Sequence, residues 1–253
     1  MDKLAFTSLA AVQSQSKIRA QITNALANVS TLGFKESYQV ATEAVKLDGA
    51  GFETRFQPAV GRRDMVNLAP GAVTMTGNPM DVALNDQTVL GVQASNGEIG
   101  FTRRGDLRVS VTGVIENAAG HLILGEAGPI TVPQGQLVTI SPDGTLFAAS
   151  PAQPDVAPLE IGQLMLRDAS AINLVRRDDG LYEPLAYNLR GGDFPTGPKV
   201  ASLQSGMLEG SNVNPVETMV RMMDFSRSFE AQMKMIKESR SIDETGSTMM
   251  RLP

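Results

Sequence analysis

The sequence predicts an α+β fold in which long N- and C-terminal helices, paired in a coiled-coil-like way, flank a central all-β domain. Two observations predict it. Apolar residues recur at helical spacing near both chain ends, and between residues 71 and 200 they alternate in short runs separated by turn signals. The expected parts are residues 1–35 (N-terminal helix and cap), 36–75 (extended arm with short strands), 76–200 (β domain) and 201–253 (C-terminal arm and helix).

The N-terminal helix is predicted from apolar residues at three- and four-residue steps, with no glycine or proline before Gly33. They are Leu4, Leu9, Val12, Ile18, Ile22, Leu26 and Val29. Glycine readily adopts the left-handed conformation that ends helices, so Gly33 is the expected cap. Phe34 is expected to fold back as an apolar anchor. The arm that follows has weak periodicity.

The middle of the chain is predicted to form many short strands. Asn96-Gly97, Asp143-Gly144 and Asp179-Gly180 separate apolar runs, and such pairs accept the positive φ of hairpin turns at low cost. Turn signals roughly ten residues apart are typical of an all-β domain. The adjacent Arg103 and Arg104 are expected to face water in preference to contacting a neighbouring subunit.

The C-terminal helix has the clearest signals. Asn214 is the expected N-cap, Pro215 occupies the first turn, and Glu217 stands at the capping-box position. Apolar residues from Val216 to Ile236 then occupy more than one face, so this helix requires more than one neighbour.

Pairing the two helices within one chain would leave the outer stripe of the C-terminal helix in water, whereas repeated pairs beside copies would cover it. Heterologous contacts that do not close produce a helical filament. We therefore expect an assembly interface on both helices. It comprises the seven apolar residues of the N-terminal stripe together with Val216, Met219, Val220, Met223, Phe225, Phe229, Met233 and Ile236.

Composition argues against several functions. The 27 acidic and 22 basic residues give a net charge of −5, which supplies no basic field for nucleic acid. The chain has no cysteine and a single histidine, His121, so we expect no catalytic, cofactor or metal site. No apolar run reaches the roughly 18 residues that cross a bilayer. The N-terminus lacks the pattern of a cleavable secretory signal.

Two other functions stay open. An enzyme acting on cell-wall glycan needs two carboxylates about 5 to 10 Å apart. Asp81, Asp86, Glu98 and Asp106 are candidates, although no motif marks a pair. An adhesin or binding module with a β-rich head would not need apolar helices at both ends of the chain.

Segments at both ends resemble the signatures of the bacterial flagellar axial proteins of the rod and hook group. ITNALANVSTLGFK (22–35) is similar to the N-terminal signature, and the stretch 208–237 that starts LEGSNVNP is similar to the C-terminal one. TGNPMDVAL (76–84) resembles the entry to the family's β domain. The start MDKL and the tail favour the proximal over the distal rod type. The matched motif residues are Ala27, Asn28, Thr31, Gly33, Phe34, Asn212 and Asn214.

The resemblance implies a structural subunit of the flagellar basal-body rod, the drive shaft that crosses the periplasm and transmits motor torque to hook and filament. It implies terminal helices that form the inner wall of a hollow axial structure. It also implies export by the flagellar type III apparatus without a cleaved signal. The implied partners are copies of the chain and other proximal and distal rod subunits, with no enzymatic activity and no cofactor.

Overall fold

A computed structural model describes residues 2–38, 43–46, 56–59, 64–153 and 156–249. The chain divides into two compact units. The helical unit comprises residues 1–27, 39–62 and 214–253, and the β unit comprises residues 28–38 and 63–213.

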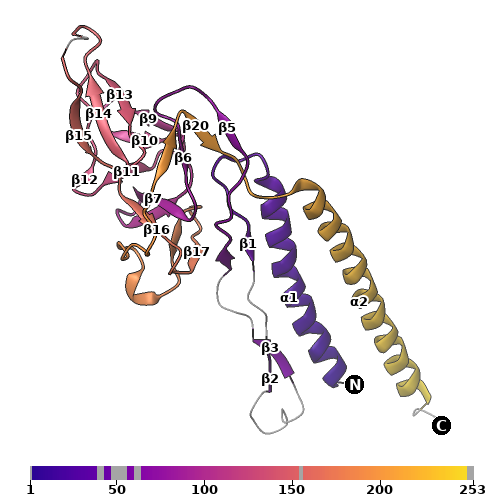
Figure 1. The fold of residues 1–253 in the computed structure, drawn as a ribbon. Helices are drawn as coiled ribbons and strands as arrows, with labels where there is room; N and C mark the ends of the chain where they lie inside the picture. The colour runs from indigo at the N-terminus through magenta and orange to yellow at the C-terminus, as the bar shows by residue number, and fades with distance from the viewer. Residues whose placement is uncertain (1, 39–42, 47–55, 60–63, 154–155, 250–253) are drawn as a thin grey trace. The chain divides into compact units, whose positions relative to one another are not determined.

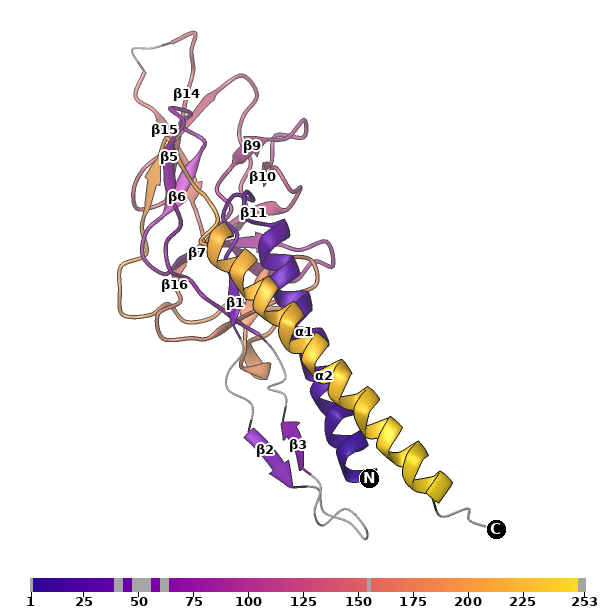
Figure 2. The same ribbon diagram turned by 90° about the vertical axis from the view of Figure 1, so that its right-hand side faces the viewer.

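The helical unit contains helix α1 (Asp2–Ala27), helix α2 (Pro215–Met249) and an antiparallel hairpin of β2 (Glu43–Lys46) and β3 (Phe56–Ala59) (Figures 1 and 2). The start of α2 is where the sequence predicts it. The Asn214 Oδ1 atom accepts the N–H of Val216 at 3.0 Å and that of Glu217 at 3.3 Å, so Asn214 is the N-cap.

The end of α1 differs from the prediction. The helix ends at Ala27, well before Gly33. The chain turns next, because Thr31 N–H donates to the Asn28 carbonyl at 3.1 Å and Thr31 Oγ1 to Asn28 Oδ1 at 3.1 Å. Gly33 therefore does not cap the helix, although its φ of +65° is left-handed as expected.

The predicted α+β class with paired, coiled-coil-like helices is wrong. Over the described residues the chain is mostly β, with twenty strands and two α-helices of unequal length. Where the helices' side chains are described, the buried ones are Gln15, Ala25 and Thr218, two of which are polar. Gln15 Nε2 donates to Ser228 Oγ at 3.3 Å. The apolar residues of α2 are spread around the helix, so they do not form the single buried seam of a coiled coil.

The β unit is built on an eleven-stranded antiparallel sheet. Nine strands follow the order β1-β4-β17-β18-β8-β7-β11-β10-β9, while β12 pairs with β11 and β16 pairs with β7. The strands are β1 (Ser37–Tyr38), β4 (Met65–Val66), β7 (Thr88–Gln93), β8 (Ile99–Thr102), β9 (Leu107–Val109), β10 (Ile115–Asn117), β11 (Leu122–Gly125), β12 (Gly128–Pro129), β16 (Leu166–Asp168), β17 (Leu174–Arg176) and β18 (Tyr182–Pro184).

Three smaller antiparallel sheets complete the β unit. They are β13 (Leu137–Ile140) with β14 (Thr145–Ala149) and β15 (Leu159–Gln163), β6 (Val82–Leu84) with β19 (Leu203–Ser205), and β5 (Val73–Met75) with β20 (Met207–Glu209). A short 3-10 helix, η1 (Tyr187–Leu189), follows β18. The pairs β6–β19 and β5–β20 join the early part of the β unit to its C-terminal end.

The three predicted hairpin turns are confirmed. Gly97 lies between β7 and β8, Gly144 between β13 and β14, and Gly180 between β17 and β18. Their φ angles of +84°, +86° and +83° lie in the left-handed region that glycine tolerates.

Two apolar clusters fill the β unit. The larger contains fully buried Leu90, Ile115 and Leu146, and the smaller is centred on Phe101 and Phe194, whose ring centroids lie 4.6 Å apart. This packing holds β7 and β8 firmly, and the polar site described next begins directly after β8.

Candidate functional site

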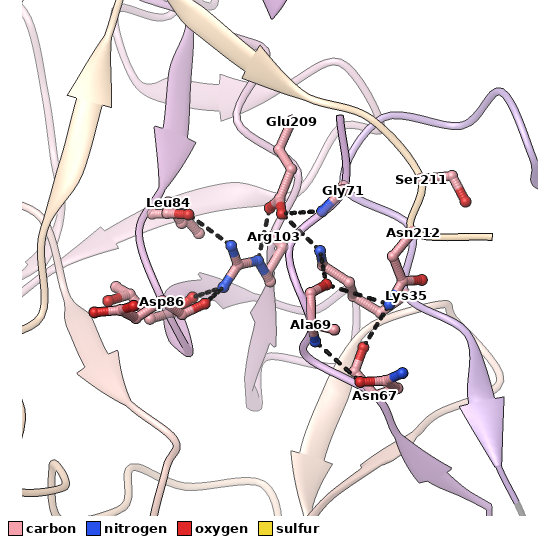
Figure 3. A network of polar contacts seen from close by, with 12 residues as sticks. Lys35, Asn67, Ala69, Gly71, Leu84, Asp86, Arg103, Glu209, Ser211 and Asn212 are labelled. Atoms are coloured by element: carbon pink, nitrogen blue, oxygen red, sulfur yellow. Dashed lines mark hydrogen bonds and ion pairs between the residues drawn. The ribbon is translucent and has the colours of Figure 1, made fainter. Parts of the chain in front are cut away.

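The most deeply buried charges of the β unit converge on Glu209, the last residue of β20 (Figure 3). Its carboxylate accepts hydrogen bonds from Lys35 Nζ at 2.7 Å, Arg103 Nε at 2.7 Å and the Gly71 N–H at 2.9 Å. The side chains of Lys35 and Arg103 are 0% exposed and that of Glu209 is 1% exposed. We call Lys35, Arg103 and Glu209 the buried triad.

Arg103 is anchored by backbone as well as by charge. Its guanidinium donates to the carbonyls of Leu84 at 2.6 Å, Asp86 at 2.6 Å and Thr88 at 3.0 Å. These bonds connect β8 with β6 and β7. A buried guanidinium is tolerated when its donors are satisfied and an anion pairs with it, and both conditions hold here.

Lys35 brings the N-terminal motif into the triad. Its Nζ also donates to the Ala69 carbonyl at 2.8 Å. Burial, together with the nearby Arg103 charge, lowers the pKa of Lys35 to about 8, and the Glu209 carboxylate opposes part of that shift. The ammonium form thus still prevails at neutral pH, and the triad holds two positive charges against one negative charge.

Gly33 packs where no larger residue fits. Its N–H donates to the Glu209 carbonyl at 2.8 Å, and its own carbonyl accepts the hydroxyl of buried Tyr182 at 3.2 Å. A Cβ atom at Gly33 would lie 2.5 Å from the backbone of Arg103 and Arg104. The motif glycine is therefore required both for its positive φ and for this close approach.

Asn212 fastens the other side of the same junction. Its Oδ1 accepts the Glu36 N–H at 2.7 Å, and its Nδ2 donates to the carbonyls of Asn67 at 2.9 Å and Ala69 at 3.2 Å (Figure 3). Its own N–H donates to the Phe34 carbonyl at 3.3 Å. Each polar atom of the amide is used, so the two motif segments are held together by side chain and backbone alike.

The remaining motif residues lie around this junction. The Arg176 guanidinium lies 4.1 Å from the centroid of the Phe34 ring, a cation–π contact, and it also donates to the Lys35 carbonyl. Phe34 is thus an anchor within the β unit. Asn28 and Thr31 form the turn after α1, Ala27 is its last residue, and Asn214 caps α2.

One residue of this site differs from the sequence prediction, and two others had no predicted role. Arg103 is buried, not facing water, and the roles of Glu209 and Tyr182 had no prediction. A charged residue inside each resembled end motif, Lys35 in GFK and Glu209 in LEGSN, was the available signal. Arg104 is partly exposed and forms a bidentate pair with Asp106 at 2.8 Å.

The predicted assembly residues of the helices vary in exposure. Ile18, Val216, Met219, Val220 and Met223 are exposed. The half-buried ones are Ile22, Leu26, Val29, Phe225, Phe229, Met233 and Ile236, and the Phe225 and Phe229 rings stack at 6.2 Å. The side chains of Leu4, Leu9 and Val12 lie outside the described residues. Their role in assembly stays a prediction.

Three of the four candidate carboxylates of a glycan-acting enzyme have separate side-chain partners. Asp81 accepts from Asn78 Nδ2 at 3.0 Å, and Glu98 pairs with Arg177 at 2.9 Å. Asp106 belongs to the pair with Arg104, while the Asp86 carbonyl binds Arg103. Among the described residues there is no group of three or more acidic or histidine side chains suited to a metal. Neither helix, over its described length, combines the length and the hydropathy of a membrane span.

Comparison with known proteins gives the deciding observation. A flagellar basal-body rod protein FlgF of Salmonella typhimurium is 38% identical over 96% of this chain and 95% of its own length. The chain belongs to the FlgF family of flagellar basal-body rod proteins. The FlgF of Escherichia coli is 35% identical over 100% of this chain and 98% of its own length.

Two family models match parts of this FlgF-family chain. The model described as flagellar hook protein FlgE/F/G D1 domain matches residues 83–148, and flagellar basal body rod FlgEFG protein C-terminal matches residues 204–249. A FlgG rod protein of Buchnera aphidicola is 31% identical over 86% of the chain and 88% of its own length. Arg103 lies within the first matched region and Glu209 within the second, so their ion pair joins two segments characteristic of FlgF and its relatives.

Proposed function

We propose that this chain acts as a stiff structural segment of the flagellar rod, transmits motor torque to hook and filament across the periplasm, and catalyses no reaction. As a FlgF-family member it is a structural basal-body rod subunit. Torque transmission requires that force entering one subunit leaves it without large internal deformation.

The buried triad is the observation that carries this proposal. Residues 28–38 continue directly from α1, and residues 209–213 continue directly into α2. Within the β unit these two segments are bonded to each other through Gly33, Lys35 and Asn212. A pull on either helix, carried along its own chain, therefore enters the β unit at this buried, hydrogen-bonded junction. A junction of this kind resists shear better than a flexible linker does.

The proposed partners are copies of this chain and other flagellar rod proteins. The helices supply the contact surface, because α2 leaves Val216, Met219 and Met223 exposed and methionine adapts to irregular partners. We include export by the flagellar type III apparatus in the proposal, since assembly beyond the inner membrane requires a route out. We also propose that the four parts predicted from the sequence (residues 1–35, 36–75, 76–200 and 201–253) act as the working divisions of the chain in the rod.

The proposal is tested by replacing the chromosomal copy with a chain truncated after Val213. Loss of swimming and of completed rods in isolated basal bodies is expected, while the wild-type copy restores both. As a matched control, Asp81, Asp86, Glu98 and Asp106 are changed together to their amides, which removes the candidate carboxylates but keeps the helices. Swimming lost in the amide variant, with the chain still present in basal bodies, would favour the enzyme instead.

A further inference from the structure

Several strands of the β unit lie at sheet edges, and two of them, β5 and β13, lie in uncharged stretches of the chain. Over the described residues β5 pairs with β20 alone, and β13 pairs with β14 alone (Figure 1). Proteins normally protect such edges with charged side chains, proline or bulges, because an exposed row of N–H and C=O groups readily pairs with another chain. The sequence around these two strands lacks that charge protection.

The segments that contain these strands are uncharged. No acidic or basic residue occurs in Met65–Met80, which contains β5, or in Ala127–Pro142, which contains β13. Apolar side chains are exposed on both strands: Met75 is 75% exposed on β5, and Leu137 is 63% exposed on β13. Each edge thus combines free backbone groups, no charge and an apolar side chain in water.

The rest of the β unit is acidic. Its residues 28–38 and 63–213 include 10 Lys and Arg and 17 Asp and Glu, a net charge of −7. Two copies would repel each other over most of this surface. The two uncharged edges are where copies approach without charge repulsion and without burying an unpaired charge.

We propose that β5 of one copy pairs with β13 of the next copy, which adds a strand across the contact between the β units. The two edges differ from each other and lie on the same chain, so the contact is heterologous and repeats from copy to copy. Main-chain hydrogen bonds supply affinity, and Val73, Met75 and Leu137 bury their exposed surfaces. The inference rests on the proposed function as a rod subunit and assigns a contact beyond the helices.

The test uses the absence of cysteine from the chain. The chromosomal copy is replaced by one with Thr74→Cys and Thr139→Cys, both at exposed positions in the middle of the two edges. Basal bodies are isolated and treated with a bis-maleimide that spans roughly 8 Å, the reach of diagonal cross-strand neighbours. The matched control carries Thr74→Cys with Val111→Cys, because Val111 is fully exposed on the turn after β9.

The expected result is a ladder of covalent dimers and larger oligomers of this chain, at least tenfold stronger than in the control. Monomers alone, a ladder equal to that of the control, or adducts formed only with a different rod protein would each overturn the inference. Chain missing from the basal bodies would instead count against the proposed function. The two single-cysteine variants are treated in the same way. If either one formed covalent dimers as strongly as the double variant, the contact would be two-fold, and the inference would be overturned.

Discussion

Glu209 Oε2 lies 2.7 Å from Arg103 Nε, and the two side chains are at most 1% exposed although 106 residues separate them in sequence. The pair shares its carboxylate with Lys35, so two cations depend on one anion. Removing that anion affects both ends of the junction at once.

Glu209→Gln is expected to destabilise the β unit by about 3 to 5 kcal/mol, because it leaves two buried cations without their partner. The measurement is urea unfolding at pH 7, followed by the strand signal in circular dichroism. Glu116→Gln is the control, since Glu116 is only partly buried and its partner Arg108 is 59% exposed. It should cost less than about 1 kcal/mol. Equal effects of the two changes would contradict the importance of the triad.

The lowered pKa of Lys35 should be visible in the pH dependence of the free energy of unfolding. Its pKa is about 8 in the folded chain and returns to 10.5 on unfolding, so between these values the unfolded chain binds more protons at this side chain. Stability from Lys35 therefore rises with pH in that window, by up to about 1.4 kcal/mol per pH unit. The free energy of unfolding of the wild type minus that of Lys35→Met should increase from pH 8 to pH 10. A flat or falling difference would refute the lowered pKa.

Gly33→Ala should be more harmful than the same change in another left-handed glycine. At Gly97, φ is +84° and a Cβ would meet no atom within 4 Å, so Gly97→Ala costs only the backbone strain of about 1 to 2 kcal/mol. At Gly33 the strain is joined by a 2.5 Å clash with the Arg103 backbone. We expect a further loss of at least about 2 kcal/mol in thermal or urea unfolding. Similar losses of stability at both positions would show that the backbone around Gly33 shifts to accommodate a Cβ atom at little cost.

Asn212→Asp tests the donor side of the junction with almost no change in shape. The new carboxylate faces the carbonyls of Asn67 and Ala69, which now accept from Nδ2, so two bonds become repulsive contacts. A loss of about 2 to 3 kcal/mol is expected. Asn96→Asp in an exposed turn should change stability by less than about 1 kcal/mol. Unchanged stability in the first variant would mean that these bonds contribute little.

The sequence was sufficient for local features and for the family. Glycine in positive-φ turns and the Asn214 cap depend on neighbouring residues only, so their patterns are readable directly. The end motifs that include Gly33 and Asn212 identified the rod and hook group. These features need no knowledge of which distant segments meet.

The predictions that were wrong concerned contacts between residues far apart in the sequence. The burial of Arg103 follows from Glu209, Lys35 and three carbonyls, which are far apart in sequence, so charge alone indicated solvent. The expected coiled-coil pairing failed because periodicity shows that a helix has apolar sides but does not show what covers them. In α2 the buried described side chain is Thr218, a polar residue that no stripe would indicate.

The bond between Gly33 and Glu209 also sets an order of events for a newly made chain. Gly33 lies shortly after α1 and Glu209 shortly before α2. The β unit therefore cannot close completely until most of the polypeptide has been synthesised. Until then the N-terminal segment has no carboxylate to bind, and a long loop must be closed against chain entropy. A nascent chain therefore stays incompletely folded for most of its synthesis, and the β unit closes only late.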